Sequence, residues 1–248
     1  DAGLGAFSYT IEVLMGFMGG TDRWRTMPWM VTFFGILVIP LGATSIVLVI
    51  LQPVAVGAWC TLCLLTALAM LIMIPLTLDE VVAMIQFLVQ AKREGKPFWR
   101  TFWKGDTVKG GGPDKRTPQF NAALTKTAPA MVWGANVPLT LLLSAALGTW
   151  LMFVPAVLHT QGAAADSDHL VGALVITFAV IAMAEVGRTL RFINILFGAW
   201  IVLAPWVLTG SVASAKWNNV ITGVAVILLS FPRGKVRDRY GSWQPYIV

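Results

Sequence analysis

The sequence predicts an all-α, polytopic integral membrane protein, and three observations carry this prediction. Of its 248 residues, 57% are hydrophobic and only 12% are charged, which is about half the charged fraction of a soluble globular domain. The mean hydropathy of +0.74 excludes a disordered chain, because disorder requires low hydrophobicity and high charge. The apolar runs are continuous rather than alternating, and this pattern disfavours a transmembrane β-barrel.

Seven stretches of the sequence can be placed as transmembrane helices, since a helix needs about 20 apolar residues to cross a bilayer. They span 2–20, 30–51, 54–78, a part of 128–158, 170–187, 192–208 and 212–231. Glu12 lies inside the first stretch. A carboxylate inside a membrane is either part of a functional site, for example for proton handling, or a hydrogen-bonded residue that faces another helix. The second interpretation is the simpler one.

The basic residues set the expected orientation. If the loop 21–29 is cytoplasmic, strict alternation of the spans places three further segments on the same side: 79–127, 188–191 and 232–248. These four segments hold 17 of the 18 Lys and Arg residues, and the exception is Lys216. By the positive-inside rule, this bias predicts cytoplasmic basic loops and a cytoplasmic C-terminus. In a bacterium, such a multi-pass protein lies in the inner membrane. The net charge of +6 is then a topology signal, so the lipid bilayer is the expected partner and nucleic acid is not.

A polar middle region separates the two apolar halves. Residues 79–106 begin with Asp79 and Glu80 and end in the basic and aromatic run AKREGKPFWRTFWK. This composition predicts either a cytoplasmic amphipathic helix that lies on the membrane face or a cytoplasmic extension of the third span, and the sequence favours neither. Residues 107–127 contain three consecutive glycines, a proline and many charges, which is typical of a polar linker.

The second half repeats itself. Residues 148–158 read GTWLMFVPAVL, and residues 198–208 read GAWIVLAPWVL, at an offset of 50. The register continues without a gap into the following span, where Leu170 corresponds to Val220. Two copies of a helix pair predict a four-helix membrane domain over 128–248, which ends in a basic tail. This half resembles the SPW-repeat family, and the resemblance implies a membrane module without an assigned activity.

Cys60 and Cys63 are the two cysteines of the chain. Their spacing places both on one side of a helical turn, and Pro53 and Gly57 suit the start of that helix. A helix start stabilises a thiolate, and the predicted topology places the pair at the outer, oxidising face, where disulfides persist. The pattern therefore favours a thiol–disulfide exchange site over its alternative, two buried cysteines that pack as small apolar side chains.

Metal chemistry is not expected at the cysteine pair. Structural zinc needs four ligands, and the only histidines, His159 and His169, have an unusual spacing and are expected to be ordinary loop residues. A c-type haem needs a histidine directly after the second cysteine, and Leu64 occupies that position. The sequence therefore predicts no metal cofactor.

Four pieces of the first 78 residues resemble the vitamin K epoxide reductase family, in a bacterial branch with an SPW-like half behind it. They are DAGLGA at 1–6, which leads into a helix with Tyr9, RWRTMPW at 23–29, LQP at 51–53 and WCTLCL at 59–64. The resemblance implies a four-helix bundle around a quinone, menaquinone or ubiquinone. It implies that electrons pass from a periplasmic thioredoxin-like partner to Cys60, then to Cys63, and then to a quinone near Cys63 and Trp59.

The resemblance also implies a helix and a loop, often with a second cysteine pair, ahead of Asp1. Because the sequence opens without a methionine or a signal peptide, we expect its N-terminus to be processed or truncated. The expected function is that of a membrane thiol–disulfide oxidoreductase with 1–78 as the reductase-like part. The alternative is a non-catalytic scaffold or accessory subunit, packed against neighbouring subunits of a larger membrane complex. A quinone-sized pocket beside Cys63 would separate the two.

Overall fold

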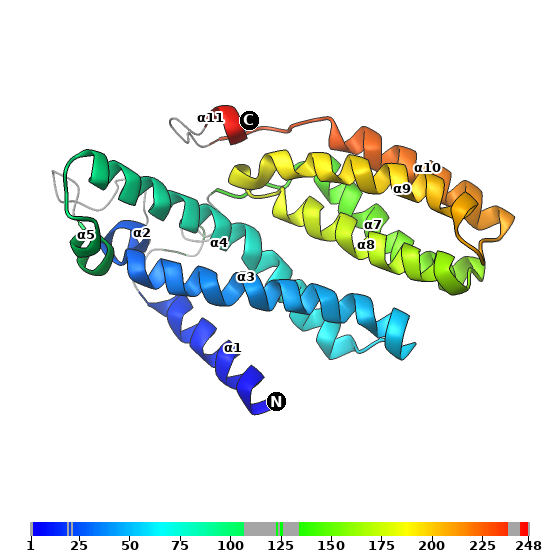
Figure 1. The fold of residues 1–248 in the computed structure, drawn as a ribbon, viewed down its shortest axis with the longest axis horizontal. Coiled ribbons are helices and arrows are strands. Elements are labelled where there is room, and N and C mark those ends of the chain that lie inside the picture. Colours follow the sequence, from blue (N-terminus) through cyan, green and yellow to red (C-terminus); the bar gives the residue numbers. More distant parts are fainter. Residues whose placement is uncertain are drawn as a thin grey trace. The chain divides into compact units, whose positions relative to one another are not determined.

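The computed structural model describes residues 2–18, 20, 22–106, 123, 125, 134–237 and 244–247. Every regular element in these ranges is helical (Figure 1), which confirms the all-α prediction. The α-helices are α1 Ala2–Phe17, α2 Arg23–Thr26, α3 Pro28–Leu51, α4 Thr61–Arg93, α5 Phe98–Lys104, α7 Leu139–Leu158, α8 Gly162–Ile181, α9 Ile193–Val207, α10 Ala213–Ser230 and α11 Gln244–Ile247. A π-helical turn, η1 Gln52–Val56, follows α3, and a 3₁₀ helix, η2 Glu185–Phe192, precedes α9. Apart from residues 123 and 125, the expected linker 107–127 lies outside the described residues.

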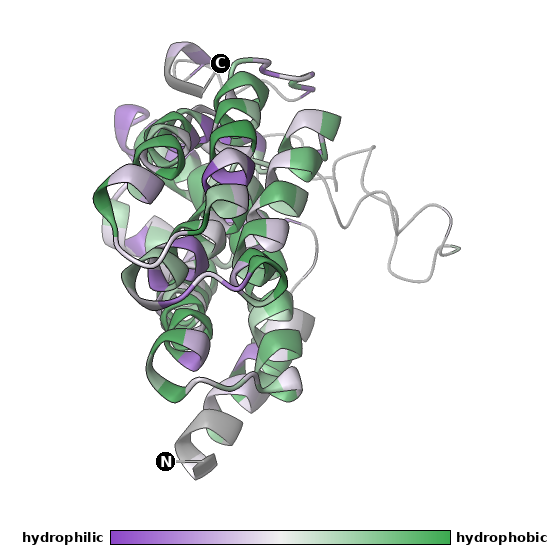
Figure 2. Cartoon of the chain, turned by 90° about the vertical axis from the view of Figure 1, so that its right-hand side faces the viewer, coloured by the Kyte–Doolittle hydropathy of each residue, from purple (hydrophilic) through white to green (hydrophobic). Residues whose placement is uncertain are grey.

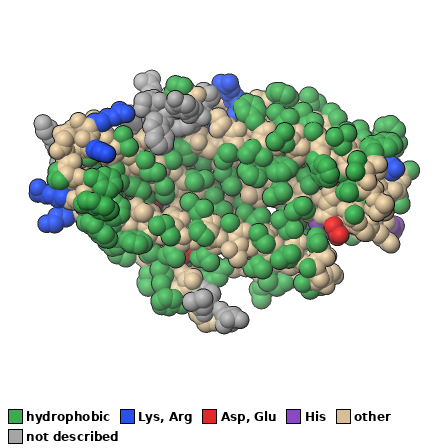
Figure 3. Space-filling view, in the orientation of Figure 1, with side chains coloured by type: hydrophobic (Ala, Val, Ile, Leu, Met, Phe, Trp, Pro, Cys, Tyr) green, Lys and Arg blue, Asp and Glu red, His purple; other side chains and the backbone are tan. Residues whose placement is uncertain are grey.

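Five helical stretches in the described part of the chain are long and apolar enough to cross a membrane. They are Pro28–Val56, Thr61–Arg93, Leu139–Leu158, Gly162–Ile181 and Glu185–Val207. The first and last of the expected spans are also helices, but α1 has only 16 residues and α10 opens with Lys216, Asn218 and Asn219. The polytopic membrane class is thus confirmed. Hydrophobic residues run along the helices in Figure 2, and hydrophobic side chains make up most of the surface drawn in Figure 3.

The described helices form two compact units, and α3 and α4 contribute one end to each. The first unit contains Asp1–Leu41 and Leu76–Trp133, and the second contains Gly42–Pro75 and Gly134–Val248. The end of α3, the start of α4 and the cysteine segment between them therefore belong to the same unit as α7 to α10. The division does not follow the halves drawn from the sequence, because α3 is continuous across the boundary at Leu41 and α4 is continuous across the boundary at Pro75.

In the first unit, α4 continues without a break from Thr61 to Arg93. The separate amphipathic helix over 79–106 therefore does not form: 79–93 is the end of α4, and α5 follows after a turn at Gly95. The helix passes Pro75 without ending, and no glycine or proline follows between Pro75 and Gly95 to interrupt it. Glu80 is held in place by an ion pair with Arg23 of α2, whose Nη2 donates to Glu80 Oε2 at 2.6 Å.

In the second unit, α7 to α10 form a four-helix bundle in which α7 contacts α8 and α10, while α9 contacts α8 and α10. Small residues allow close crossings of membrane helices. A Cβ added to Gly148 of α7 would lie 2.7 Å from the carbonyl oxygen of Gly172 in α8. A Cβ added to Gly198 of α9 would lie 2.8 Å from the carbonyl oxygen of Gly223 in α10. The two helix pairs thus cross in the same way.

These crossings correct the register of the repeat. Gly148 and Gly198 are 50 residues apart, as the sequence predicts, but their partners Gly172 and Gly223 are 51 apart. A second pair of contacts agrees: the indole N–H of Trp150 donates to Asn218 at 2.9 Å, and that of Trp200 donates to Ser167 at 3.0 Å. The gapless register was wrong after α7 and α9. The identical residues of the two copies end with these helices, so the sequence did not fix the alignment of the helices that follow. The turns that follow absorb an extra residue at little cost.

Candidate functional site

The segment between α3 and α4 carries both cysteines. The π-helical turn η1 ends at Gly57, which has a left-handed backbone with φ of 69°, and α4 begins only at Thr61. The sequence places Pro53 and Gly57 at the start of the next helix, and this placement was wrong. A left-handed glycine is a signal that ends a helix, so Gly57 closes the preceding turn and Cys60 comes directly before α4.

The two cysteines are joined in a disulfide, and their Cα atoms lie 5.3 Å apart. Cys60 holds the start of α4, because its carbonyl accepts the N–H of Leu64 at 3.0 Å and its Sγ accepts the N–H of Cys63 at 3.3 Å. Both cysteines are exposed in the chain. The disulfide is therefore accessible, and its sulfurs lie at a helix start, where backbone N–H groups favour negative charge.

Gln52 supports the cysteine segment from the preceding turn. Its side-chain Oε1 accepts the backbone N–H of Cys60 at 2.8 Å. The sequence analysis identifies Gln52 only as part of the LQP piece and assigns it no role. One signal could have identified it. Backbone N–H groups between two helices need acceptors, and Gln52 is a polar side chain at the end of an apolar helix, eight residues before Cys60.

Trp59 lies against the repeat domain. Its ring centroid is 5.9 Å from that of Phe153 in α7 and 5.8 Å from that of His169 in α8. His169 is thus a helix residue with a ring contact rather than a loop residue, while His159 caps the end of α7. Sequence reasoning missed this cluster because about a hundred residues separate its members and no local pattern links them. The repeat domain provides a surface for the segment that carries the cysteines.

The surroundings of the disulfide are apolar and exposed. Val56, Leu62 and Leu65 are 72%, 77% and 60% exposed, which suits contact with lipid or with a hydrophobic molecule. Two pockets in the described part of the chain lie elsewhere, one lined by residues near the start of α7 and the other by residues of α4 and α5. Among the described residues, no group of three or more His, Cys, Asp or Glu side chains could hold a metal ion.

Glu12 is buried in α1, at 4% exposed. Its Oε1 accepts no hydrogen bond from a described residue. The hydrogen-bonded alternative is therefore not confirmed for this oxygen.

These features define a polytopic α-helical membrane protein with an exposed C-x-x-C disulfide at the start of a helix. Comparison with family models gives two matches: residues 1–78 match the Vitamin K epoxide reductase family, and residues 139–232 match the SPW repeat domain. Both agree with the predicted fusion, and the first supports a membrane thiol oxidoreductase-type function. Comparison with curated proteins and with solved structures gives no match.

Proposed function

We propose that this chain is a membrane thiol–disulfide oxidoreductase. Cys60 and Cys63 alternate between disulfide and dithiol, oxidise a periplasmic thioredoxin-like dithiol partner and pass the electrons to a membrane quinone. The observation that carries the proposal is the exposed Cys60–Cys63 disulfide directly at the start of α4. It lies inside the segment that matches the reductase family model.

The exchange with the partner is balanced in two steps. A partner thiolate attacks Sγ of Cys60, so that a mixed disulfide forms and Cys63 leaves as a thiolate. The second thiolate of the partner then attacks the partner sulfur that is bonded to Cys60. This step completes the partner disulfide and releases Cys60 as a thiolate. The N–H of Cys63 already points at Cys60 Sγ, at 3.3 Å, and it would stabilise negative charge on the released sulfur.

A membrane quinone is the electron acceptor in this proposal. The reductase family is generally quinone-associated, and a quinone accepts the two electrons and two protons that leave the dithiol when the disulfide reforms. Trp59, Leu62 and Leu65 offer exposed apolar surface on either side of Cys63, so they are the residues that would hold a lipid-soluble ring system. Whether the acceptor is menaquinone or ubiquinone is an outcome of the experiment.

Thiol trapping in native membranes tests the proposal. The protein is reduced, the reductant is removed, and a menaquinone or ubiquinone analogue is added before alkylation with a maleimide that adds mass. We expect two labels per chain before the quinone and none after it. If both labels persist, or if the cysteines never react, the redox proposal fails and the chain is better interpreted as a structural subunit of a membrane complex.

A matched pair of variants identifies the partner-facing thiol. Cys63→Ser leaves Cys60 able to form a mixed disulfide but unable to resolve it, so a covalent partner complex should accumulate. Cys60→Ser is the control and should accumulate little. The same maleimide, applied to intact cells in a membrane-impermeant form, tests the proposed periplasmic location of the pair, because only outward-facing thiols are labelled.

A further inference from the structure

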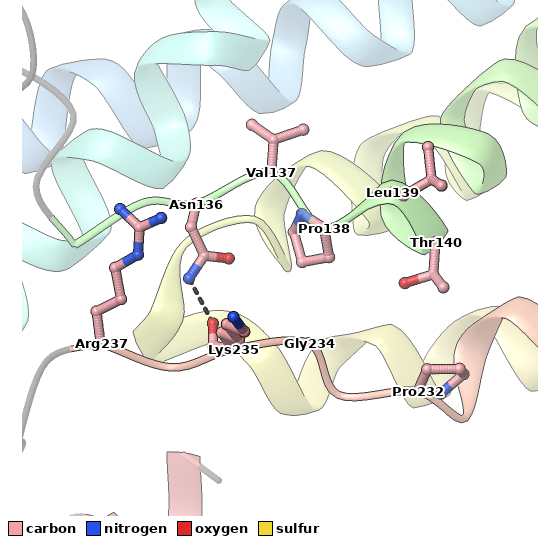
Figure 4. Close-up of a pocket in the computed structure, with 9 residues that line it drawn as sticks. All are labelled: Asn136, Val137, Pro138, Leu139, Thr140, Pro232, Gly234, Lys235 and Arg237. Carbon is pink, nitrogen blue, oxygen red and sulfur yellow. Dashed lines mark hydrogen bonds between the residues drawn. The ribbon is translucent and has the colours of Figure 1, made fainter.

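A basic pocket lies at the start of α7, at the other end of this helix from Phe153 and the cysteine segment. The pocket has a volume of about 350 Å³. Its walls are residues 136–140, which lead into α7, and Pro232, Gly234, Lys235 and Arg237, which follow α10 (Figure 4). Two segments about a hundred residues apart in the sequence therefore build one site.

A hydrogen-bond network around the buried Glu185 and Arg188 holds the two walls together. Asn136 Nδ2 donates to the carbonyl of Lys235 at 2.6 Å, which Figure 4 shows as a dashed line, and to Glu185 Oε1 at 2.6 Å. The backbone N–H of Arg237 donates to both oxygens of Glu185 at 3.0 Å, and Arg188 donates to Asn136 Oδ1 at 2.5 Å. Glu185 and Arg188 are 1% and 0% exposed. The pocket is thus pre-formed by the fold rather than by mobile side chains.

The two walls also approach closely. Gly234 has a left-handed backbone with φ of 71°. A Cβ at this position would lie 2.8 Å from the Pro138 ring and 3.8 Å from Nη1 of Arg188. The Arg188 guanidinium is therefore beside the pocket, behind the glycine.

Positive charge dominates this end of the repeat domain. The cations are Arg188, Arg191, Arg233, Lys235 and Arg237, and the one acidic side chain in the network is Glu185. Arg191 is 1% exposed, and its Nη2 donates to no described residue. The Thr140 hydroxyl of the pocket also lacks a hydrogen-bond partner among the described residues. Two buried and three exposed cations at one end of the domain favour a bound anion, and a phosphate accepts hydrogen bonds from Lys, Arg and hydroxyl donors of the kind that line the pocket.

Exposed apolar side chains beside the pocket favour a phospholipid headgroup over a free phosphate ion. Val137 and Leu139 line the pocket and are 62% and 68% exposed, and Phe231, next to Pro232, is 57% exposed. A free phosphate ion gains no binding energy from apolar side chains, whereas a phospholipid has acyl chains next to its headgroup that can pack against them. Basic pockets at the end of transmembrane helices recognise anionic headgroups in this way.

We propose that this pocket binds the phosphate headgroup of an anionic glycerophospholipid, with the acyl chains along Val137, Leu139 and Phe231. Lys235 and Arg237 provide the exposed cations that contact the phosphate, and the buried Arg188 and Arg191 provide the field behind it. The site is independent of the cysteine pair, so it stands whether or not the chain transfers electrons.

Native mass spectrometry of the full chain in detergent tests the proposal, with phosphatidylglycerol, phosphatidylcholine and inorganic phosphate as separate probes. Phosphatidylglycerol should bind more tightly than phosphatidylcholine. A juxtamembrane cation strengthens anionic-lipid binding by a factor of roughly five, so Lys235→Ala with Arg237→Ala should weaken phosphatidylglycerol binding about 30-fold. Both side chains are exposed, and the network uses only their backbone groups, so the double variant retains the fold.

Lys216→Ala is the matched control, because it removes one lysine from the opposite end of α10, where Lys216 lies over the Trp206 ring. Its affinity for phosphatidylglycerol should equal that of the unchanged protein, whereas Lys235→Ala alone should lose about fivefold. Equal binding of both lipids, or an equal loss in Lys216→Ala and Lys235→Ala, would overturn the proposal. If inorganic phosphate displaces the lipid completely at similar concentration, the pocket is a phosphate site and the lipid source is wrong.

Discussion

Replacing Gly198 with alanine tests the close crossing of α9 and α10. The new Cβ would lie 2.6 Å from Ile227 Cγ1 and 2.8 Å from the backbone oxygen of Gly223. The isoleucine can rotate away, but the backbone oxygen cannot, so the helices must separate. Overpacking of this kind costs about 1–3 kcal/mol. The higher helix propensity of alanine stabilises the folded protein by up to about 1 kcal/mol and partly offsets this cost. The steric cost is therefore measured against a second Gly→Ala variant that has no clash.

Gly16→Ala in α1 is that reference. It makes the same chemical change in a helix, and no heavy atom of the described residues lies within 4 Å of the new Cβ. The propensity gain cancels between the two variants, which leaves the steric cost of about 1–3 kcal/mol. For a chain of this size, that difference lowers the melting temperature of Gly198→Ala by about 2–12 °C relative to Gly16→Ala.

The assay is thermal unfolding in detergent, followed by the fluorescence of the 11 tryptophans. The melting temperature of Gly148→Ala should be lowered like that of Gly198→Ala, because its Cβ would lie 2.7 Å from the Gly172 oxygen. If both melt at the temperature of Gly16→Ala, the helices do not cross at these glycines, and the one-residue shift in the repeat that rests on them is refuted.

Three further predictions follow from the contacts of the chain. Trp59→Ala removes two ring contacts worth about 0.5–1.5 kcal/mol each, so backbone hydrogen exchange over 57–60 should accelerate, while Trp59→Phe should keep much of the protection. Gln52→Ala leaves the Cys60 N–H without its acceptor, a loss of about 0.5–1.5 kcal/mol; quinone-dependent disulfide formation should slow about 2–10-fold in the trapping assay, and an unchanged rate would exclude a role for Gln52. Arg23→Ala leaves the partly buried Glu80 carboxylate without Arg23, so it should lower the melting temperature more than the double variant Arg23→Ala with Glu80→Ala; the reverse order would show that the unpaired carboxylate carries no penalty.

Composition was enough to predict the fold class, because few charges and continuous apolar runs allow little else. The spacing of Cys60 and Cys63 also predicted that they share one helical turn, and the disulfide between them, with Cα atoms 5.3 Å apart, agrees with this. The details that depend on competing local signals were not predictable. Gly57 suits the start of a helix as well as its end, and only the backbone shows that it ends η1. Likewise, Asp79 and Glu80 could open a new helix or continue α4, and only the structure shows that α4 continues past Pro75 to Arg93.

The contacts of Trp59 show why the rest of the site could not be derived from sequence, and they also distinguish the two copies of the repeat. In the corrected register, Phe153 corresponds to Leu203, and His169 corresponds to Val220. The shared features of the copies, such as the paired glycines and the tryptophan hydrogen bonds, maintain the bundle. The copies differ at the two positions that meet Trp59, where only the first copy has rings.

This asymmetry bears on what the repeat domain contributes. A domain that served only as a membrane anchor would need no aromatic surface at the end of α7 and the start of α8. The first helix pair instead presents Phe153 and His169 to the residue directly before Cys60. Because ring contacts stabilise the segment that precedes the disulfide, we expect the repeat domain to limit how far the cysteines can move. A change in α7 or α8 should therefore alter thiol reactivity in the other family segment.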